Sequence, residues 1–378
     1  MVDASFGAEK LDRCLGGTLG GSNLVTVSGS TIFNSSSALS GSNLVVANGG
    51  LTIAGGLSLS GRTLVNAAAA LWTNAGAATI NFINGSVLSN APSGTFGFNI
   101  GLGGNLGSGN AGAIVNQGLF RKFGSASTVT VEVPFTNSGT VEVDSGTLSI
   151  NFNSVSYVQN AGVTFLNGGN LANNVPLQIL GGSLTGAGLI SGSVTNAGLL
   201  SPGSPIGQIT VSGSYIQTAA GGLAIDLGGT NPVTGFDQLV VSGATKLAGA
   251  LTVHITNGFV PSVSNQFQVL ACSNITGTFS TLNVPAGISV NYSNSGVFLV
   301  VTGAVAVPVL LQAPQISSTN FTFNFQTASN QSYTIQQTAN LAVPSWTNVT
   351  NFDGDGTLFR FIGPLTNLPP TFYRVREP

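Results

Sequence analysis

A repeat of about 20 residues is the feature that most constrains what this chain can fold into. Residues 21–25 read Gly-Ser-Asn-Leu-Val, residues 41–45 repeat this sequence, and residues 61–65 repeat it loosely as Gly-Arg-Thr-Leu-Val. A unit this short cannot bury its own apolar side chains, so it needs copies of itself stacked above and below. The repeat therefore predicts a solenoid, an elongated rod of stacked coils.

The repeat continues in weaker form along the chain as triplets of the form Asn-x-Gly, which begin at Asn74, Asn116, Asn137 and Asn160. We expect each triplet to form a corner, because Asn tolerates the left-handed backbone region and Gly adopts it freely. Between corners, residues 128–133 and 139–144 are β-branched or alternate between apolar and polar. Such runs are typical of short strands.

The fold class follows from the coil length and the strand pattern. Only residues 7–15 look compatible with a helix, so we expect an all-β protein. Propeller blades are longer than this repeat, and the Leu-x-x-Leu-x-Leu pattern of leucine-rich horseshoes is absent. Short strands joined by tight bends, together with 53 glycines in 378 residues, predict a right-handed parallel β-helix over residues 20–303.

The two ends differ from the solenoid. Residues 1–19 are dense in charge, and we expect them to cap the first coil, with Leu11 and Leu15 on its apolar interior. Residues 304–314 are rich in Ala, Val and Pro and are expected to form a linker. Residues 315–378 contain alternating runs, for example at 321–325 and 333–337, and predict a small antiparallel β-sandwich module.

Charge is scarce, with only nine Lys or Arg and eleven Asp or Glu residues, and this excludes several classes of partner. Without a basic cluster the chain has no electrostatic footprint for nucleic acid or for an anionic membrane. The apolar run from Gly296 to Leu311 is shorter than the ~20 residues of a membrane-spanning helix, so we expect no integral membrane segment. A surface of Ser, Thr and Asn suits contact with glycans or with other copies of the chain.

Enzymatic β-helices need clustered carboxylates with a basic partner, and the strongest candidates here are Glu132, Glu142 and Asp144. Glu142 and Asp144 share one face of a strand by the period-two rule, whereas Glu132 is half a coil away and lies on another face. We expect all three to be solvated residues of the strand surface without a basic partner. They carry no predicted catalytic role.

Other candidate sites are weaker still. His254 is the only histidine and is expected at an exposed strand position. Asp353 and Asp355 resemble part of a calcium loop but lack its downstream Glu, which favours a hairpin turn. The glycine-rich residues 101–104 precede no helix and form no phosphate loop. The sequence thus predicts no catalytic residue, no metal site and no cofactor.

Cys14 and Cys272 are the only cysteines and lie at opposite ends of the predicted rod. A disulfide needs Cα atoms within roughly 7 Å, so we expect two small buried residues and no bridge. The first ten residues contain acidic side chains and no apolar segment, so they are not expected to be a signal peptide. Few cysteines in a chain rich in Ser, Thr and Asn fit a bacterial surface protein.

Two segments add a resemblance to known proteins. Residues 201–207 (Ser-Pro-Gly-Ser-Pro-Ile-Gly), together with residues 213–217, 223–227 and 236–243, resemble the C-terminal part of autotransporter passenger β-helices. The pattern at 333–338, 346–347 and 372–375 resembles a small β-domain that closes secreted proteins of Verrucomicrobia-type and Planctomycetes-type bacteria. The resemblance implies a secreted β-helix, although only 77 residues follow residue 301, too few for a translocating membrane barrel.

The expected function is therefore that of a secreted or cell-surface structural or adhesive protein without catalytic activity, such as a stalk, an adhesin or a matrix component. A second hypothesis is a β-helix that binds or cleaves polysaccharides. A third is the subunit of a self-assembling extracellular fibre, because a rod with uncharged ends can stack head to tail without closing.

Overall fold

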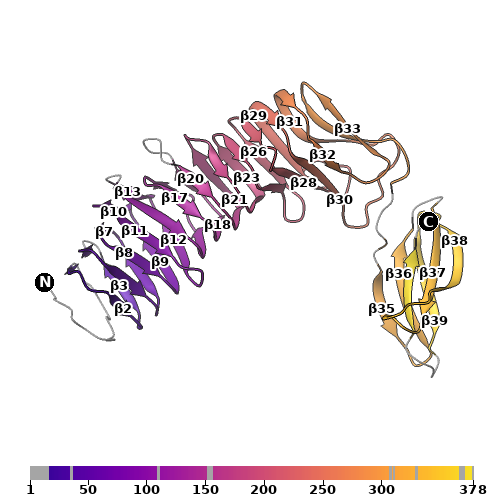
Figure 1. The fold of residues 1–378 in the computed structure, drawn as a ribbon, viewed down its shortest axis with the longest axis horizontal. Helices are drawn as coiled ribbons and strands as arrows, with labels where there is room; N and C mark the ends of the chain where they lie inside the picture. Colours follow the sequence, from indigo (N-terminus) through magenta and orange to yellow (C-terminus); the bar gives the residue numbers. More distant parts are fainter. Residues whose placement is uncertain are drawn as a thin grey trace.

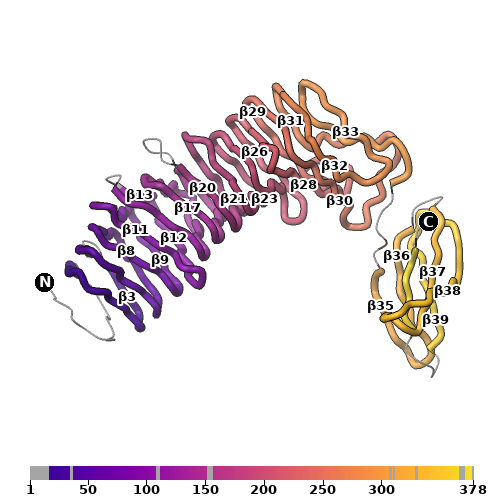
Figure 2. The backbone as a smooth tube through the Cα atoms, in the orientation of Figure 1, coloured from indigo at the N-terminus to yellow at the C-terminus, as the bar shows by residue number. Residues whose placement is uncertain are grey.

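The structure is a computed structural model that describes residues 17–34, 37–108, 111–150, 156–305, 309, 311–327, 331–365 and 371–376. Every regular element in these residues is a β-strand (Figure 1). Most of the strands belong to a long rod in which the chain coils repeatedly around one axis (Figure 2). The predicted class, an all-β parallel β-helix followed by small antiparallel sheets, is confirmed.

Three parallel ladders form the walls of the β-helix, and each strand pairs with its counterpart in the next coil. Ladder 1 begins with β1 (Thr18–Leu19), β4 (Ser37–Ser40), β7 (Leu57–Ser60), β10 (Ala78–Ile83), β13 (Gly104–Ser108), β16 (Thr128–Val131) and β19 (Thr147–Ile150). It continues through the later part of β21 (Val163–Asn173) and of β23 (Ser183–Ser191), β26 (Gln208–Val211), and the first part of β29 (Gln238–Leu247) and of β31 (Gln266–Gly277).

Ladder 2 consists of β2 (Val25–Val27), β5 (Leu44–Ala47), β8 (Thr63–Asn66), β11 (Ser86–Asn90), β14 (Gly112–Asn116), β17 (Phe135–Asn137), β20 (Tyr157–Gln159), β22 (Leu177–Ile179), β24 (Val194–Asn196), β27 (Tyr215–Gln217) and the later parts of β29 and β31. Ladder 3 consists of β3 (Thr31–Asn34), β6 (Leu51–Ala54), β9 (Ala69–Asn74), β12 (Thr95–Ile100), β15 (Leu119–Lys122), β18 (Thr140–Val143), the first parts of β21 and β23, β25 (Leu199–Pro202), β28 (Gly222–Leu227), β30 (Ala250–Ile255) and β32 (Thr281–Asn283).

Alternating side chains explain why these segments become the walls of a rod. In β7 the side chains of Leu57 and Leu59 are buried, while those of Ser58 and Ser60 are only partly buried. The same alternation along successive strands produces one continuous apolar core that runs from Leu19 to Val305. The core therefore grows by stacking, as the short repeat requires.

A column of aromatic rings occupies the middle of this core. Phe96 stacks on Phe120 with ring centroids 5.5 Å apart, and Phe120 contacts Phe135 at 5.0 Å. Phe135 then meets Tyr157 edge to face at 5.1 Å. Rings at these separations add stabilisation beyond the area that they bury.

Buried amides form a second column along ladder 2. The Nδ2 of Asn66 donates to Oδ1 of Asn90 at 2.8 Å, Asn90 donates to Asn116 at 2.7 Å, and Asn116 donates to Asn137 at 2.7 Å. Asn137 continues the column to Oε1 of Gln159 at 3.3 Å. Each side-chain amide thus donates a hydrogen bond to the amide of the next coil. These bonds satisfy polar groups that are buried inside the rod, where water does not reach them.

The Asn-x-Gly triplets do lie at bends between strands, as predicted, but the column corrects the reason given for them, a left-handed backbone. Asn116 and Asn137 are buried, with 0% and 1% of their surface exposed, and their side chains point inward. None of the four asparagines has a positive φ, and of the four glycines only Gly162 has one, at 73°. Burial of a hydrogen-bonded amide, and not backbone freedom, is the reason for Asn at positions 116 and 137.

The close approach of neighbouring coils explains why the 20-residue repeat begins with a glycine. Gly41 has a φ of 122°, and a Cβ there would lie 1.8 Å from the carbonyl oxygen of Gly21 in the preceding coil. The buried Arg62, from the third copy of the repeat, donates from Nη2 to that oxygen at 2.5 Å and to the carbonyl oxygen of Asn23 at 3.1 Å. One side chain therefore links the third copy of the repeat to the first.

A hairpin closes the C-terminal end of ladder 1. β33 (Ile288–Ser293) and β34 (Gly296–Val301) are antiparallel, and β34 also runs antiparallel to the start of β31. The side chains of Val297, Leu299 and Val301 are buried against the core. β34 is therefore the last strand of the rod, but it breaks the parallel arrangement predicted for residues 20–303, because the chain reverses direction before it.

The predicted N-terminal cap lies outside the described residues, apart from residues 17–19, where β1 begins. Leu11, Leu15 and Cys14 belong to this undescribed part. Cys272, in β31, is a half-buried free thiol. Its expected full burial is therefore only partly met.

The C-terminal module consists of two three-stranded antiparallel sheets. The sheets contain β35 (Gln312–Ile316), β36 (Asn320–Gln326) and β39 (Leu358–Pro364) on one side, and β37 (Ser332–Thr338), β38 (Thr347–Asp353) and β40 (Phe372–Arg376) on the other. A separate core of Phe323, Phe325, Tyr333, Ile335 and Phe361 joins them. The first strand begins at Gln312, inside the stretch predicted as linker, and the segment from Asp353 to Leu358 crosses between the two sheets and is not a hairpin turn.

Candidate ligand-binding surface

Charged side chains on the outside of the β-helix concentrate on ladder 3. β15 carries Arg121 outward, β18 carries Glu142 with Asp144 just beyond its end, and β28 and β30 carry Asp226 and His254. The coil length causes this, because residues at the same place in successive coils stack along one wall. The rest of the surface presents mainly hydroxyl and amide groups. Ladder 3 is therefore the wall where ionisable side chains are concentrated.

Arg121, Glu142 and Asp144 form one ion-pair cluster. Arg121 lies beside Glu142 in the register of β15 and β18, and its Nε is 3.5 Å from Oε2 of Glu142. Its Nη2 and its Nε both contact Oδ2 of Asp144 at 2.6 Å. On the next strand, Nδ2 of Asn167 donates to Oδ1 of Asp144 at 3.2 Å.

The cluster confirms one prediction and overturns another. Glu142 and Asp144 do share a face, and Glu132, which follows β16 in ladder 1, lies on a different one. The prediction that the pair has no basic partner is wrong, because the register brings Arg121 next to both. Glu132 is also not solvated, since only 9% of its surface is exposed, and burial raises the pKa of its carboxyl.

The carboxyl groups of Glu142 and Asp144 both contact the same arginine, and each affects how easily the other ionises. Desolvation is the main cause that raises the pKa of Glu142, followed by a hydrogen bond from its side chain to Asp144, while Arg121 opposes the rise. The pair therefore resembles a polar anchor more than an acid and base on opposite sides of a sugar bond.

Two phenylalanines flank this cluster. Among the described residues from β1 to β30, Phe123 and Phe165 are the aromatic residues that are not buried. A Cβ at Gly97 would lie 2.9 Å from Cε1 of Phe123, and a Cβ at Gly186 would lie 2.9 Å from Cδ2 of Phe165. Each ring thus lies over a glycine of the neighbouring strand. The guanidinium of Arg121 is 5.7 Å from the centroid of Phe123.

His254 and Asp226 form a second, smaller pair toward the C-terminal end of ladder 3. The two residues are directly opposed in the register of β28 and β30, and Nδ1 of His254 is 3.2 Å from Oδ1 of Asp226. The side chain of His254 is 57% exposed, which confirms its predicted surface position. Its acidic partner, 28 residues earlier, was not predicted.

A buried carboxyl lies close to this pair. Asp237 is fully buried, and its two oxygens accept hydrogen bonds from the backbone N–H groups of Gly207 and Asp226, both at 2.9 Å. Desolvation raises its pKa to about 7, although the two backbone donors oppose the rise. Asp237 therefore joins two turns of the coil and titrates close to neutral pH.

The buried carboxyl groups make stability depend on pH. In the unfolded chain Asp237 has an ordinary pKa near 4, so between pH 4 and 7 the folded protein binds more protons and loses stability as the pH rises. We expect the β-helix to be more stable at pH 5 than at pH 8 by roughly 2 to 3 kcal/mol from this group. Glu132 and Glu142 act in the same direction, because their pKa values are also raised.

Thermal unfolding of the wild type and of Asp237→Asn across pH 4 to 8 tests this expectation. The variant has no group to titrate at this position, so its midpoint should change less with pH than that of the wild type. Equal slopes for the two proteins would contradict the assignment.

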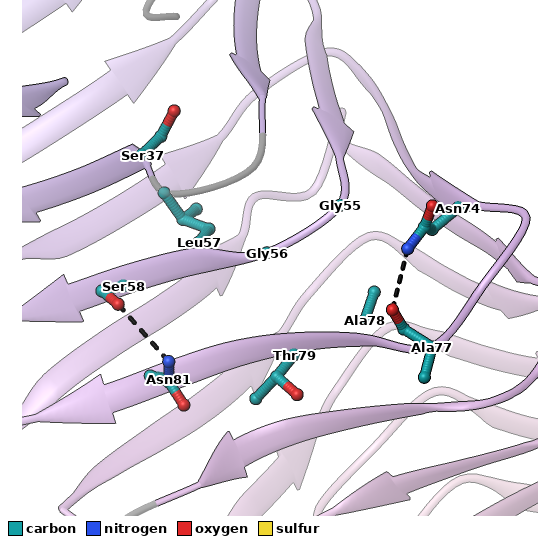
Figure 3. A pocket seen from close by; sticks show the side chains of 10 residues that line it. All are labelled: Ser37, Gly55, Gly56, Leu57, Ser58, Asn74, Ala77, Ala78, Thr79 and Asn81. Atoms are coloured by element: carbon teal, nitrogen blue, oxygen red, sulfur yellow. Dashed lines mark hydrogen bonds between the residues drawn. The ribbon is translucent and has the colours of Figure 1, made fainter. Parts of the chain in front are cut away.

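A shallow depression of about 370 Å³ lies where the chain turns from ladder 3 into ladder 1 (Figure 3). Gly55 and Gly56, which have no side chains, open it between neighbouring coils. Its polar side chains are Ser37, Ser58, Asn74, Thr79 and Asn81. The amide of Asn74 donates to the carbonyl oxygen of Ala77 at 2.8 Å, and that of Asn81 donates to Oγ of Ser58 at 3.4 Å. The depression offers hydroxyl and amide groups and contains no titratable residue.

The remaining charged candidates have local partners. Lys122 is fully buried, and its Nζ donates to the carbonyl oxygens of Ser125 at 2.8 Å and Ser145 at 3.3 Å, while burial lowers its pKa. In the module, Oδ1 of Asp355 accepts from the backbone N–H of Thr357 at 2.9 Å, and Oδ1 of Asp353 accepts from Ser332 at 2.5 Å. These carboxylates therefore stabilise their own loop and the adjoining strand.

Within the described part of the chain, no three His, Cys, Asp or Glu side chains come together as metal ligands do. The same residues include no helix with the length and apolar character needed to cross a bilayer. The glycine-rich residues 101–104, which were excluded as a phosphate loop, form the connection from β12 and the first residue of β13. Comparison of the chain with protein-family models and with curated proteins finds no match.

Proposed function

We propose that this protein is an extracellular or bacterial cell-surface β-helix that acts as a rigid structural or adhesive element, such as a stalk, an adhesin or a matrix component. The observation that carries the proposal is the continuous core from Leu19 to Val305, which is stacked coil upon coil and reinforced inside by the amide column. Such a rod is stiff because every coil is hydrogen-bonded to two neighbours. Its surface of Ser, Thr and Asn suits exposure to water with few charges.

Adhesion has more support than catalysis. The densest cluster of charged groups consists of an arginine already neutralised by carboxylates, and the depression beside ladder 1 contains no titratable group. The fibre hypothesis has less support than a single rod, because the antiparallel β34 covers the edge of β31 where a further parallel strand would have to pair.

Localisation and shape test this proposal. Antibodies against the purified protein should label the surface of intact source cells or the culture medium, and protease added to intact cells should remove the signal. Electron microscopy of the purified protein should show unbranched rods of one length. Confinement to the cytoplasm would overturn the proposal.

A further inference from the structure

We propose that Phe123, Phe165 and the ion-pair cluster between them form a binding surface for a neutral, extended β-1,4-linked polysaccharide. The inference deepens the adhesive role proposed above and names its partner by chemistry. The surface, called here the ladder 3 patch, lies on three successive strands, β15, β18 and β21, and on the residues directly after the first two. It consists of Arg121, Phe123, Glu142, Asp144, Phe165 and Asn167.

The aromatic residues are the first argument. Elsewhere between β1 and β30, the aromatic side chains of the described residues are buried in the core, so an outward Phe is an exception on this rod. Both exceptions lie within two strands of each other and on the same wall. Aromatic rings carry negative charge on their faces, and the C–H groups of a pyranose with equatorial hydroxyls present a positive, apolar face to them.

Spacing is the second argument. Strands of neighbouring coils are about 4.8 Å apart, close to the length of one pyranose unit in an extended β-1,4-linked chain. Phe123 is level with Asp144 beyond β18, and Phe165 pairs directly with Glu142. The Cα positions of the two residues are therefore roughly two strand spacings apart along the rod and about two residues apart along the strand. The rings themselves lie farther apart, because each is turned over the glycine on the strand outside the pair. A ligand that contacts both must span at least three sugar units.

The polar groups between the rings are the third argument. Arg121 retains 42% side-chain exposure although it is ion-paired, and Asn167 is exposed, so both can still meet a ligand. Guanidinium, carboxylate and amide groups together donate to and accept from sugar hydroxyls. One arginine against two carboxylates gives the patch no surplus of positive charge, which favours a neutral chain over an acidic one.

Binding of defined glycans tests the proposal. The probes are cellohexaose and cellobiose in titration calorimetry, and hydroxyethyl cellulose and polygalacturonate in affinity electrophoresis. We expect the wild-type protein to bind cellohexaose and hydroxyethyl cellulose, to bind cellobiose far more weakly, and to leave polygalacturonate unbound. Phe123→Ala and Phe165→Ala should each weaken binding about tenfold or more, in line with the loss of one stacking contact.

Matched variants separate loss of the ring from loss of the fold. Phe123→Tyr and Phe165→Tyr keep the ring and should keep binding. Ile216→Ala removes an exposed apolar side chain, with 40% of its surface accessible, from ladder 2 and should also keep binding. Thermal unfolding of each variant shows that the rod is intact.

Three results would overturn the proposal: no binding of cellohexaose by the wild type, unchanged binding in both alanine variants, or preference for polygalacturonate. Release of shorter chains from hydroxyethyl cellulose would overturn binding without cleavage. A protein that is found on the cell surface but binds none of these glycans would leave the structural role standing, whereas a cytoplasmic protein would remove that role whatever it binds.

Discussion

Replacing Asn116 with alanine lowers the free energy of unfolding of the β-helix by about 3 to 5 kcal/mol. The amide of Asn116 donates to Asn137 at 2.7 Å, to the carbonyl oxygen of Thr140 at 3.0 Å and to that of Gly118 at 3.1 Å, while its Oδ1 accepts from Asn90. Truncation leaves several of these partners buried without water, and each unsatisfied group costs about 1 to 3 kcal/mol. It also leaves a void between coils.

Urea and thermal unfolding followed by circular dichroism measure this effect. Asn105→Ala is the matched control, because Asn105 is exposed on β13 and lies outside the amide column. Its midpoint should differ little from that of the wild type. If Asn116→Ala is no less stable than Asn105→Ala, the column contributes nothing to the rod.

Removal of residues 285–378, which include the hairpin β33–β34, makes the β-helix aggregate. The deletion uncovers the edge of β31 and exposes Phe267 and Leu270, while the buried side chains of Val297, Leu299 and Val301 are lost from the core. Burial of each such side chain contributes about 1.5 to 3 kcal/mol, so the uncovered interface is worth on the order of 10 kcal/mol as an upper estimate. An open strand edge also templates pairing with another chain.

Light scattering after size-exclusion chromatography distinguishes the outcomes. The control deletes residues 315–378 only, which removes most of the C-terminal module and keeps the hairpin. Because the module has a core of its own, this shorter deletion should leave a monodisperse protein whose thermal midpoint is nearly that of the wild type. A monodisperse 285–378 deletion would show that the hairpin does not protect the end, and a large shift for the control would show that the module stabilises the rod.

Part of the ladder 3 patch could have been predicted from the sequence. Arg121 and Glu142 are 21 residues apart, one coil by the repeat, so the coil-length reasoning that placed Glu132 half a coil away could have placed Arg121 next to Glu142. His254 and Asp226 are 28 residues apart because the chain between them contains a longer loop, and no constant coil length would have paired them. The amide column could not be predicted in this way either. Four strands of ladder 2 end in an asparagine of the column, but the spacing between these asparagines varies along the sequence: Asn66, Asn90, Asn116 and Asn137.

The sequence by itself determined the solenoid, the strand positions and the separate character of the C-terminal module. These depend on local properties: a 20-residue repeat that cannot bury itself, side chains that alternate along each strand, and a change to aromatic, alternating runs near the end of the chain. Each can be recognised within a few residues. The predicted strands at 128–133, 139–144 and 321–325 accordingly correspond to β16, β18 and β36.

Only the tertiary structure decided which side chains meet across coils and how the rod ends. The register between neighbouring coils depends on the exact length of every turn. A coil that is longer by two or three residues changes which side chains lie opposite each other on adjacent strands. Burial then decides the chemistry, since Asn116 and Asp237 have ordinary sequence neighbours yet lie in the interior, where an amide must be paired and a carboxyl is harder to ionise. The reversal into β34 has the same origin, because it depends on the exposed edge of β31 and not on the local sequence of the strand that covers it.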